Sequence, residues 1–348
     1  MRQEIKIGNR TLGDHHPLFI MAECGVTCNY DLDLTKQLID VVAESGADGI
    51  KFIFWFPDEI MSDKSIDYTY ETTAGIKTEN MYTMLSKLQF TLDQWKQVKA
   101  YADEKNVIFF STVNSSTGIT WAEELKLDAY KLSSWDFNYI PLWRDIAKKG
   151  KPMIIDTGPV DSEEVQKVLD VMQEEGNDQS LLVHCYHTKL PEEINMRSIP
   201  YMRQAFDSLV GFSAVDYRDE MDIVGVSLGS CFLEKRLTMR RDLPGHHHAI
   251  SKEPDEFKRY VEMIREVHAS LGEENLIPSK ADLLERKKWF RRLVANHDLK
   301  AGTVLVASDL EGKRPEEGGI SPECLGDFLG KKLKRDLREN EPISRDDV

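Results

Sequence analysis

Residues 18–234 contain eight short apolar runs, and longer amphipathic stretches separate many of them. The runs are Leu18–Ala22, Gly49–Phe54, Val107–Ser111, Ala129–Leu132, Pro152–Asp156, Leu181–His184, Leu209–Ser213 and Ser230–Glu234. The segments Leu34–Ser45, Leu92–Lys105, Ile140–Lys149 and Val160–Glu175 have the apolar spacing of surface helices. Eight strands that alternate with helices predict an α/β fold of the (β/α)8 TIM-barrel type.

The chain changes character after the last barrel helix, near Leu271. Short β-like pieces, Leu293–Ala295 and Thr303–Val306, flank a turn at Lys300-Ala301-Gly302, and a second turn is predicted at Pro315–Gly319. The sequence therefore predicts a barrel over residues 1–271, a charged linker over 272–288 and a small β-rich domain over 289–348.

Composition excludes several classes of protein. A net charge of −15 argues against a general nucleic-acid partner, because phosphate backbones require a basic surface. No window approaches the roughly 18 apolar residues of a membrane span, and the polar segment Met1–Arg10 lacks the apolar core of a signal peptide. The five cysteines are few and odd in number, which indicates reduced thiols. We expect a cytoplasmic protein with no membrane partner.

Polar residues follow the predicted strands at their C-terminal ends, where TIM-barrel active sites lie. They are Glu23, Lys51, Ser111, Thr112, Lys131, Ser133, Ser134, Asp156, Thr157, His184, Cys185, Ser213, Glu234, Lys235 and Arg236. Two lysines and several hydroxyls from different strands can bind a phosphorylated or carboxylated small molecule, and a carboxylate can handle protons. A single member could instead cap a helix or form a rim ion pair, but packing explains the whole set less well.

The order of these motifs resembles the sialic acid (N-acetylneuraminate) synthase family, a NeuB-type barrel followed by a C-terminal SAF (antifreeze-like, β-clip-like) domain. The matching barrel segments are Phe19–Val26 with Asn29, Gly46–Phe52, Phe110–Thr112, Ala129–Leu132, Gly150–Pro152, Thr157-Gly158, His184-Cys185, Gly211–Ser213 and Glu234-Lys235. In the small domain, the matching segments are Lys313-Arg314-Pro315, Gly319–Pro322 and Leu329–Lys331.

This resemblance implies a carbon–carbon bond-forming reaction between phosphoenolpyruvate and a sugar aldehyde. C3 of phosphoenolpyruvate attacks the aldehyde, water adds to C2 and phosphate leaves, which yields a 3-deoxy-2-keto acid. The positions matched to phosphoenolpyruvate binding are Lys51, Lys131, Ser134, Asp156, His187 and Ser213. Glu23 matches the acid/base residue, and His247 and Arg314 match positions that contact the sugar. The resemblance also implies a domain-swapped homodimer in which Arg314 reaches the partner chain's site.

The sequence departs from the family at the metal site. The family binds one divalent cation (Mn or Mg) through two histidines, but Val215 and Arg236 stand at those positions, and neither can ligate a metal. Ile53 replaces a glutamine. We favour the hypothesis that Arg236 supplies a fixed positive charge in place of the metal and acts catalytically. Two alternatives stay open: a metal held by Cys28, His187 and His246–His248, or a chain that has lost condensation.

Further departures concern the acceptor half of the site. His247 replaces an aspartate, residues 186–190 replace a Thr-Asn/Ser-x-Tyr-Pro motif, and Asp156 replaces a serine that helps hold phosphoenolpyruvate. The aromatic run Phe54–Phe56 is interpreted as packing or a lid, or alternatively as an apolar aldehyde pocket. We therefore expect an acceptor other than N-acetylmannosamine. The alternative function is a non-catalytic or repurposed sugar-phosphate-binding homologue.

Overall fold

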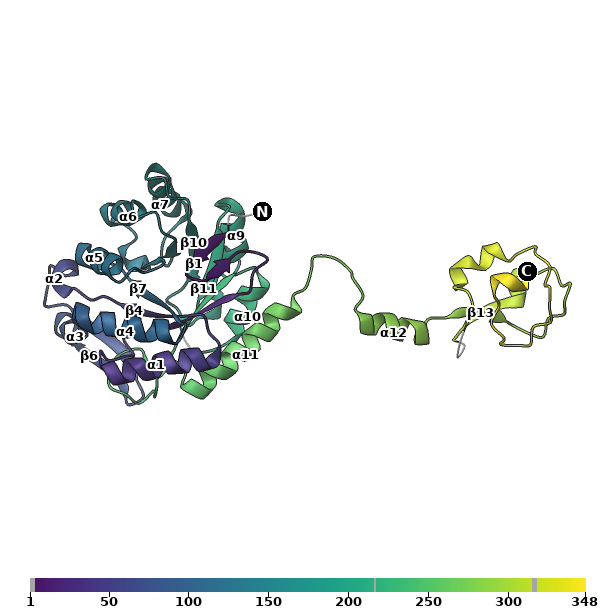
Figure 1. Cartoon of the computed structure of the whole chain (residues 1–348), viewed down its shortest axis with the longest axis horizontal. Helices are drawn as coiled ribbons and strands as arrows, with labels where there is room; N and C mark the ends of the chain where they lie inside the picture. Colours follow the sequence, from purple (N-terminus) through teal and green to yellow (C-terminus); the bar gives the residue numbers. More distant parts are fainter. Residues whose placement is uncertain (1–3, 216, 315–317) are drawn as a thin grey trace. The chain divides into compact units, whose positions relative to one another are not determined.

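The computed structural model describes residues 4–215, 217–314 and 318–348. It divides into two compact units, Met1–Gly272 and Glu273–Val348, which are described separately (Figure 1).

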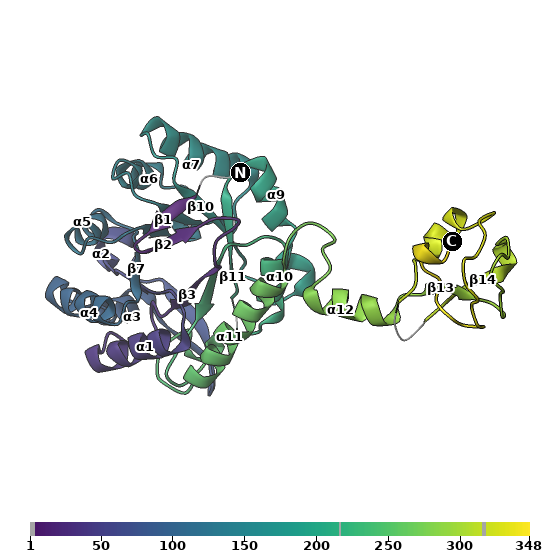
Figure 2. The same ribbon diagram turned by 45° about the vertical axis from the view of Figure 1, so that its right-hand side comes forward.

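The first unit is a closed barrel of eight parallel strands that run in sequence order around the barrel (Figure 2). The strands are β3 (Phe19–Glu23), β4 (Gly49–Ile53), β7 (Ile108–Thr112), β8 (Tyr130–Leu132), β9 (Met153–Asp156), β10 (Ser180–Cys185), β11 (Leu209–Ser213) and β12 (Phe232–Arg236). The predicted (β/α)8 fold is confirmed, and each predicted run overlaps one strand of the barrel.

Helices surround the strands (Figure 1). The longer ones are α1 (Leu32–Ser45), α4 (Leu92–Glu104), α5 (Ser116–Glu124), α6 (Ile140–Ala147), α7 (Ser162–Glu174), α9 (Ser198–Ala205), α10 (Glu220–Ser227) and α11 (Pro254–Ser270). Short helical segments are α2 (Pro57–Ile60), α3 (Met81–Lys87), α8 (Pro191–Ile194), η1 (Ser134–Asp136) and η2 (His248–Ile250). Helix α1 begins two residues before the predicted segment, after Asp31, whose carboxylate accepts a hydrogen bond from the Leu34 amide. It ends at Gly46, which has a left-handed φ of 76°.

Two hairpins that the strand pattern did not predict complete this unit. The hairpin of β1 (Ile5–Ile7) and β2 (Arg10–Leu12) packs its apolar side chains against the first inward-facing residues of the barrel strands, such as Phe19 and Ile108. It therefore closes the N-terminal end of the barrel. The second hairpin, β5 (Asp67–Thr72) and β6 (Gly75–Asn80), follows β4 and α2.

The aromatic run after β4 is a packing element. Phe54 is fully buried, with its ring centroid 5.2 Å from that of Trp95. Phe56 stacks edge-on against Trp121 at 4.8 Å. Trp55 packs on a small cluster that includes Tyr70 of the β5–β6 hairpin. The packing and lid interpretation fits these contacts, and Phe54 is not available to line an aldehyde pocket.

Side chains that face the barrel interior are apolar near the strand starts and polar or charged at most of the strand ends. Near the strand starts, Phe19 stacks on Phe232 at 5.4 Å and meets Phe110 edge-on at 5.8 Å. Successive residues of a strand face opposite sides, so the residues two and four positions further on face inward again. This alternation places the charged residues of the strand ends above an apolar floor.

The second unit contains one antiparallel pair, β13 (Arg292–Ala295) and β14 (Leu310–Lys313), and helix α12 (Lys280–Trp289). Its 3-10 segments are η3 (Ala307–Asp309), η4 (Pro322–Asp327) and η5 (Arg345–Asp347). A core around Leu293, Leu305 and Phe328 holds it together. Helix α12 buries no side chain and occupies much of the segment predicted as linker.

Two local predictions for the second unit concern a strand at Thr303–Val306 and a turn at Pro315–Gly319. The predicted strand Thr303–Val306 forms only a single bridge, between Val304 and Lys332, because its partner segment is irregular. In the predicted turn and motif, residues 315–317, including Pro315, lie outside the described residues. Across the described part of the chain, we find no helix with the length and apolarity needed to cross a membrane.

Candidate active site

Six charged side chains from five barrel strands form an alternating chain of ion pairs at the C-terminal end of the barrel. In order, they are Arg236, Glu23, Lys51, Glu234, Lys131 and Asp156. These six residues, called the charge chain below, comprise three cations and three carboxylates, so their formal charges cancel without a ligand.

Glu234 is the centre of this charge chain. Its Oε1 lies 2.7 Å from Lys51 Nζ and its Oε2 lies 3.5 Å from Lys131 Nζ. Strand β8, which carries Lys131, is opposite β12, which carries Glu234, in the closed barrel. Glu234 and Lys131 can therefore meet only across the barrel interior. Because Glu234 also contacts Lys51, both lysines point into the same part of the interior. This is the arrangement that an anion-binding site from two strands requires.

The protonation states within the charge chain follow from burial and neighbouring charge. Burial acts to raise the pKa of Glu234, but Lys131 and Lys51 outweigh it and lower the pKa to about 2. Burial acts to lower the pKa of Lys131, but Asp156 and Glu234 outweigh it and raise the pKa above its ordinary value. Burial raises the pKa of Asp156, with Lys131 opposing this and Glu234 adding to it. Asp156 is therefore more easily protonated than Glu234.

The two carboxylate oxygens of Glu23 differ in their hydrogen bonding. Its Oε1 accepts a hydrogen bond from the Gly25 amide at 2.8 Å and lies 3.9 Å from Lys51 Nζ. A side chain at Gly25 would clash, because its Cβ would lie 2.6 Å from Glu23 Oε1. Glu23 Oε2 is buried without a hydrogen-bond partner among the residues described. This oxygen can exchange a proton with a substrate.

Arg236 adjoins Glu23 at one end of the charge chain. Its Nε lies 3.5 Å from Glu23 Oε2, and its Nη1 donates to the carbonyl of Val215 and, at 3.5 Å, to that of Ala214. The guanidinium has five N–H donors, so others stay available to a ligand. Val215 offers no side-chain lone pair, and a permanent cation fills the neighbouring position. The residues at the two family metal positions therefore do not fit a divalent cation.

The three consecutive histidines, His246–His248, have different surroundings. His248 is structural, because its Nδ1 lies 2.7 Å from Thr238 Oγ1 and its Nε2 lies 3.1 Å from Asn29 Oδ1. His246 packs edge-on against Tyr68 and Tyr70 of the β5–β6 hairpin.

His247 has a left-handed φ of 70°, and its Nδ1 is buried with no hydrogen-bond partner in the described chain. Burial and the nearby Arg236 hold the pKa of His247 well below its ordinary value. His247 is thus a neutral imidazole near the arginine.

The alternative metal site predicted from Cys28, His187 and the histidine triplet does not form. Cys28 is fully buried in the core, and burial raises its thiol pKa to about 12, whereas metal binding needs a thiolate. Within residues 4–215, 217–314 and 318–348, no group of three or more His, Cys, Asp or Glu side chains is placed to hold a metal ion.

The remaining predicted anion contacts are Ser134 in η1, His187 after β10 and Ser213 at the end of β11. Ser134 Oγ is 3.4 Å from His187 Nε2, and the His187 ring stacks on Trp135 at 4.6 Å. Gly158 allows this approach, since its φ is 45° and an added Cβ would lie 2.3 Å from Ser134 Cβ. Ser213 ends β11 in register with Cys185 and Glu234.

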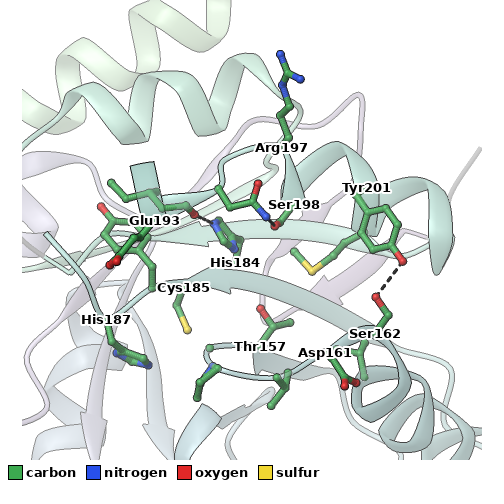
Figure 3. A pocket seen from close by; sticks show the side chains of 18 of the residues that line it. Thr157, Asp161, Ser162, His184, Cys185, His187, Glu193, Arg197, Ser198 and Tyr201 are labelled. Carbon is green, nitrogen blue, oxygen red and sulfur yellow. Dashed lines mark hydrogen bonds between the residues drawn. The ribbon is translucent and has the colours of Figure 1, made fainter. Parts of the chain in front are cut away.

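A cavity of about 750 Å³ adjoins this group on one side, between the β9–α7 loop and the segment from β10 to α9 (Figure 3). Thr157, Cys185 and His187 line it on the barrel side, and Ser162 and Tyr201 line the outer side, where their hydroxyls are 2.9 Å apart. The pKa of Cys185 is raised to about 12, first by burial and then by Asp156. Cys185 therefore both lines this cavity and is a neighbour of Asp156 in the charge chain.

Two predicted barrel residues, Lys235 and His184, face away from the charge chain. Lys235 points out of the barrel, where it pairs with the buried Asp222 of α10 at 2.7 Å. His184 also faces outward, with its Nε2 2.8 Å from the Ile194 carbonyl oxygen. Arg314 belongs to the second unit, is exposed and donates from Nε to the Trp289 carbonyl at 2.8 Å.

Three residues in or near the site were given no role from the sequence. Glu234 was not assigned a role, although it lies two residues before Arg236 and two after Phe232, and this alternation indicates an inward position. Tyr68 and Tyr70 alternate with polar residues over Asp67–Thr72, which is a strand-like signal, but the hairpin that carries them was not predicted.

Comparison with known proteins agrees with this geometry. Residues 38–276 match the model of the NeuB family, and residues 290–348 match the model of the SAF domain. An uncharacterised protein of Methanocaldococcus jannaschii is 31% identical, with 99% of each chain covered. The N,N'-diacetyllegionaminic acid synthase of Campylobacter jejuni is 31% identical over 93% of this chain and 98% of its own.

A solved structure extends the likeness to three dimensions. The spore coat polysaccharide biosynthesis protein SpsE of Bacillus subtilis superposes with a TM-score of 0.67 and 26% identity, and 99% of each chain is covered. The family match covers more than half of the chain, and relatives at 31% identity span nearly all of it. The chain belongs to the NeuB family and carries a C-terminal SAF domain.

Proposed function

We propose that this protein condenses phosphoenolpyruvate with a sugar aldehyde to form a nonulosonic acid-like 3-deoxy-2-keto acid and phosphate. The observation that carries the proposal is the convergence of Lys51 and Lys131 on one carboxylate, Glu234, across the barrel interior. A relative's name, N,N'-diacetyllegionaminic acid synthase, agrees with a nonulosonic acid as the product.

Phosphoenolpyruvate carries a phosphate and a carboxylate, and the two lysines supply the matching charges. Ser134, His187 and Ser213 would offer hydrogen bonds to the anion; Ser134 and His187 are 3.4 Å apart, and Ser213 is in register with Glu234. In such a site, fixed donors stabilise the bound enolpyruvate without reorganisation. C3 then attacks the aldehyde carbon, water adds to C2 and phosphate leaves.

The acceptor would bind at the Arg236 end of the charge chain. There, the guanidinium can donate to the aldehyde oxygen as it becomes an alkoxide. Glu23 Oε2, which lies 3.5 Å from Arg236 Nε and accepts no hydrogen bond within the described residues, can carry a proton. His247 is neutral and stands where the family has an aspartate, so it offers different hydrogen bonds to a sugar hydroxyl. We infer that the acceptor differs from N-acetylmannosamine and that turnover needs no divalent metal.

A phosphate-release assay tests both the reaction and its independence from metal. With phosphoenolpyruvate and a panel of aldoses and acylated amino sugars, we expect phosphate release that changes less than twofold when a chelator is added. Release that depends on the chelated metal would contradict the role of Arg236. No release with any acceptor, despite phosphoenolpyruvate binding, would favour a sugar-phosphate-binding homologue without catalysis.

Arg314 gives a prediction about assembly. If it completes a site on a partner chain, Arg314→Ala should raise the KM for the acceptor about tenfold or more and leave phosphoenolpyruvate binding unchanged. The size follows from the loss of a charged hydrogen bond, about 1.5–3 kcal/mol. Arg292→Ala, a change on the same unit, serves as the control. Mixing Arg314→Ala with an inactive Lys131→Met chain should restore part of the activity only if sites are shared between chains.

A further inference from the structure

Asp156 occupies the position where an anion would approach Lys131. It ends β9 and forms an ion pair with Lys131 Nζ, whose other carboxylate neighbour is Glu234, 3.5 Å away. Its second oxygen, Oδ1, is buried and has no hydrogen-bond partner within the described residues. Lys131 itself is completely buried and already shared by two carboxylates.

A phosphate or carboxylate that binds beside Lys131 would add negative charge to a group that is already balanced. The alternating chain gives each cation at least one carboxylate neighbour, so an incoming anion meets repulsion from Asp156 as well as attraction from Lys131. Like charges at contact distance in a buried site cannot both stay ionised, and one of them gains a proton. Asp156 is the group that can relieve this repulsion.

We propose that Asp156 takes up a proton when the anionic substrate binds beside Lys131, so that it acts as a proton-coupled specificity residue for the enolpyruvate anion. The inference rests on the proposed function, because it assumes that an anion binds there. Protonation turns an acceptor-only carboxylate into a hydroxyl donor. The protonated Asp156 can then donate a hydrogen bond to the oxygen of the bound anion that had repelled it.

Other groups that face Asp156 are less suited to take the proton. The titratable or charged residues around it are Lys131 of β8, Glu234 of β12, Lys51 of β4, Cys185 of β10 and His187 of the following loop. Glu234 lies between two lysines, which hold its pKa at about 2. Burial lowers the pKa of His187, although Asp156 opposes this. Asp156 has one lysine and an oxygen without a partner, and burial already raises its pKa.

The sign of the pH dependence follows from linkage. An anion beside Asp156 raises its pKa further, so the complex binds more protons than the free protein between the two pKa values. Affinity therefore rises as pH falls through that range, by up to about tenfold per pH unit for one proton. Outside the range, Asp156 has the same charge in both states and its contribution to the slope vanishes.

Calorimetric titration of the full-length protein tests the proposal. Phosphoenolpyruvate is titrated from pH 6.5 to 8.5 in two buffers of different protonation enthalpy, which gives the number of protons taken up on binding. We expect the wild type to take up more protons than Asp156→Asn, by as much as one per ligand, and to lose affinity more steeply with rising pH. Inorganic sulfate, which does not titrate in this range, should show the same uptake with the wild type alone.

Asp156→Ser serves as a second variant if the asparagine protein does not fold, and it should also bind with little proton uptake. Equal uptake in the wild type and both variants, or sulfate binding without uptake, would overturn this inference and leave the proposed function standing. Absence of phosphoenolpyruvate binding in the wild type and in both variants would remove the proposed function, and this inference with it.

Discussion

Replacing Lys131 by methionine is expected to lower kcat/KM for phosphoenolpyruvate by about a thousandfold. Lys131 is fully buried and is the cation that joins Glu234 to Asp156. Methionine has a similar length but no charge. The substrate anion would then face Asp156 and Glu234 without the ammonium group that lies between them in the wild type. Loss of one partner from a buried charge pair costs about 2–5 kcal/mol, which corresponds to a factor of this order. Steady-state kinetics and calorimetry with phosphoenolpyruvate measure the effect.

Lys235→Met is the matched control for this change. Lys235 is equally buried and also pairs with a carboxylate, Asp222 at 2.7 Å, but it lies on the outer face of β12. Both variants should lose stability, since each leaves a buried carboxylate unpaired at a cost of about 3–5 kcal/mol. At a temperature where both are folded, only Lys131→Met should lose phosphoenolpyruvate affinity. Equal loss in the two variants would mean that Lys131 acts through stability alone.

Arg236→Ala should lower kcat by about 10²- to 10³-fold while the Kd for phosphoenolpyruvate changes little. Removal of a donor directed at a developing oxyanion typically has an effect of this size. Arg236 lies at the Glu23 end of the charge chain, away from Lys131, so the loss should fall on the step that involves the aldehyde. Single-turnover measurements with saturating phosphoenolpyruvate separate this step from binding. Unchanged turnover would remove the proposed electrophilic role.

Two further variants define what Arg236 supplies. Arg236→Lys keeps the positive charge but loses the planar fork, so it should recover part of the activity lost in Arg236→Ala. The double change Val215→His with Arg236→His places two metal ligands at the family positions. If Arg236 stands in for the metal, this double variant should show activity that depends on added Mn²⁺ and disappears with a chelator. Binding of Mn²⁺ by the double variant can also be followed directly by calorimetry.

Much of the barrel could be predicted from the chain because its strands are buried on both faces. Such strands appear as short apolar runs, and the helices between them carry one apolar face, so both kinds of element leave a periodic signal. The end of each run then identified Glu23, Lys51, Lys131, Asp156 and Ser213 as neighbours at one end of the barrel. The topology alone makes this inference possible, since parallel strands have their C-terminal ends at the same side.

The two hairpins escaped prediction for a physical reason. The β5–β6 hairpin is largely exposed. Strand β5 shows only a short alternation, with Tyr68 and Tyr70 between polar residues, and β6 carries polar residues on both faces. The β1–β2 hairpin has strands of only three residues each. Its apolar side chains gain their burial from the barrel floor, which does not exist until the distant strands assemble.

The sequence by itself determined the barrel, the residues at its strand ends and the absence of ligating side chains at positions 215 and 236, because these depend on local periodicity and residue type. Only the tertiary structure decided the partners of those residues. Glu234 became the link between Lys51 and Lys131, Asp156 paired with Lys131, and Lys235 turned away from the site. Ion pairs between opposite strands depend on the closure of the barrel, and no pattern along the chain encodes a distance across it.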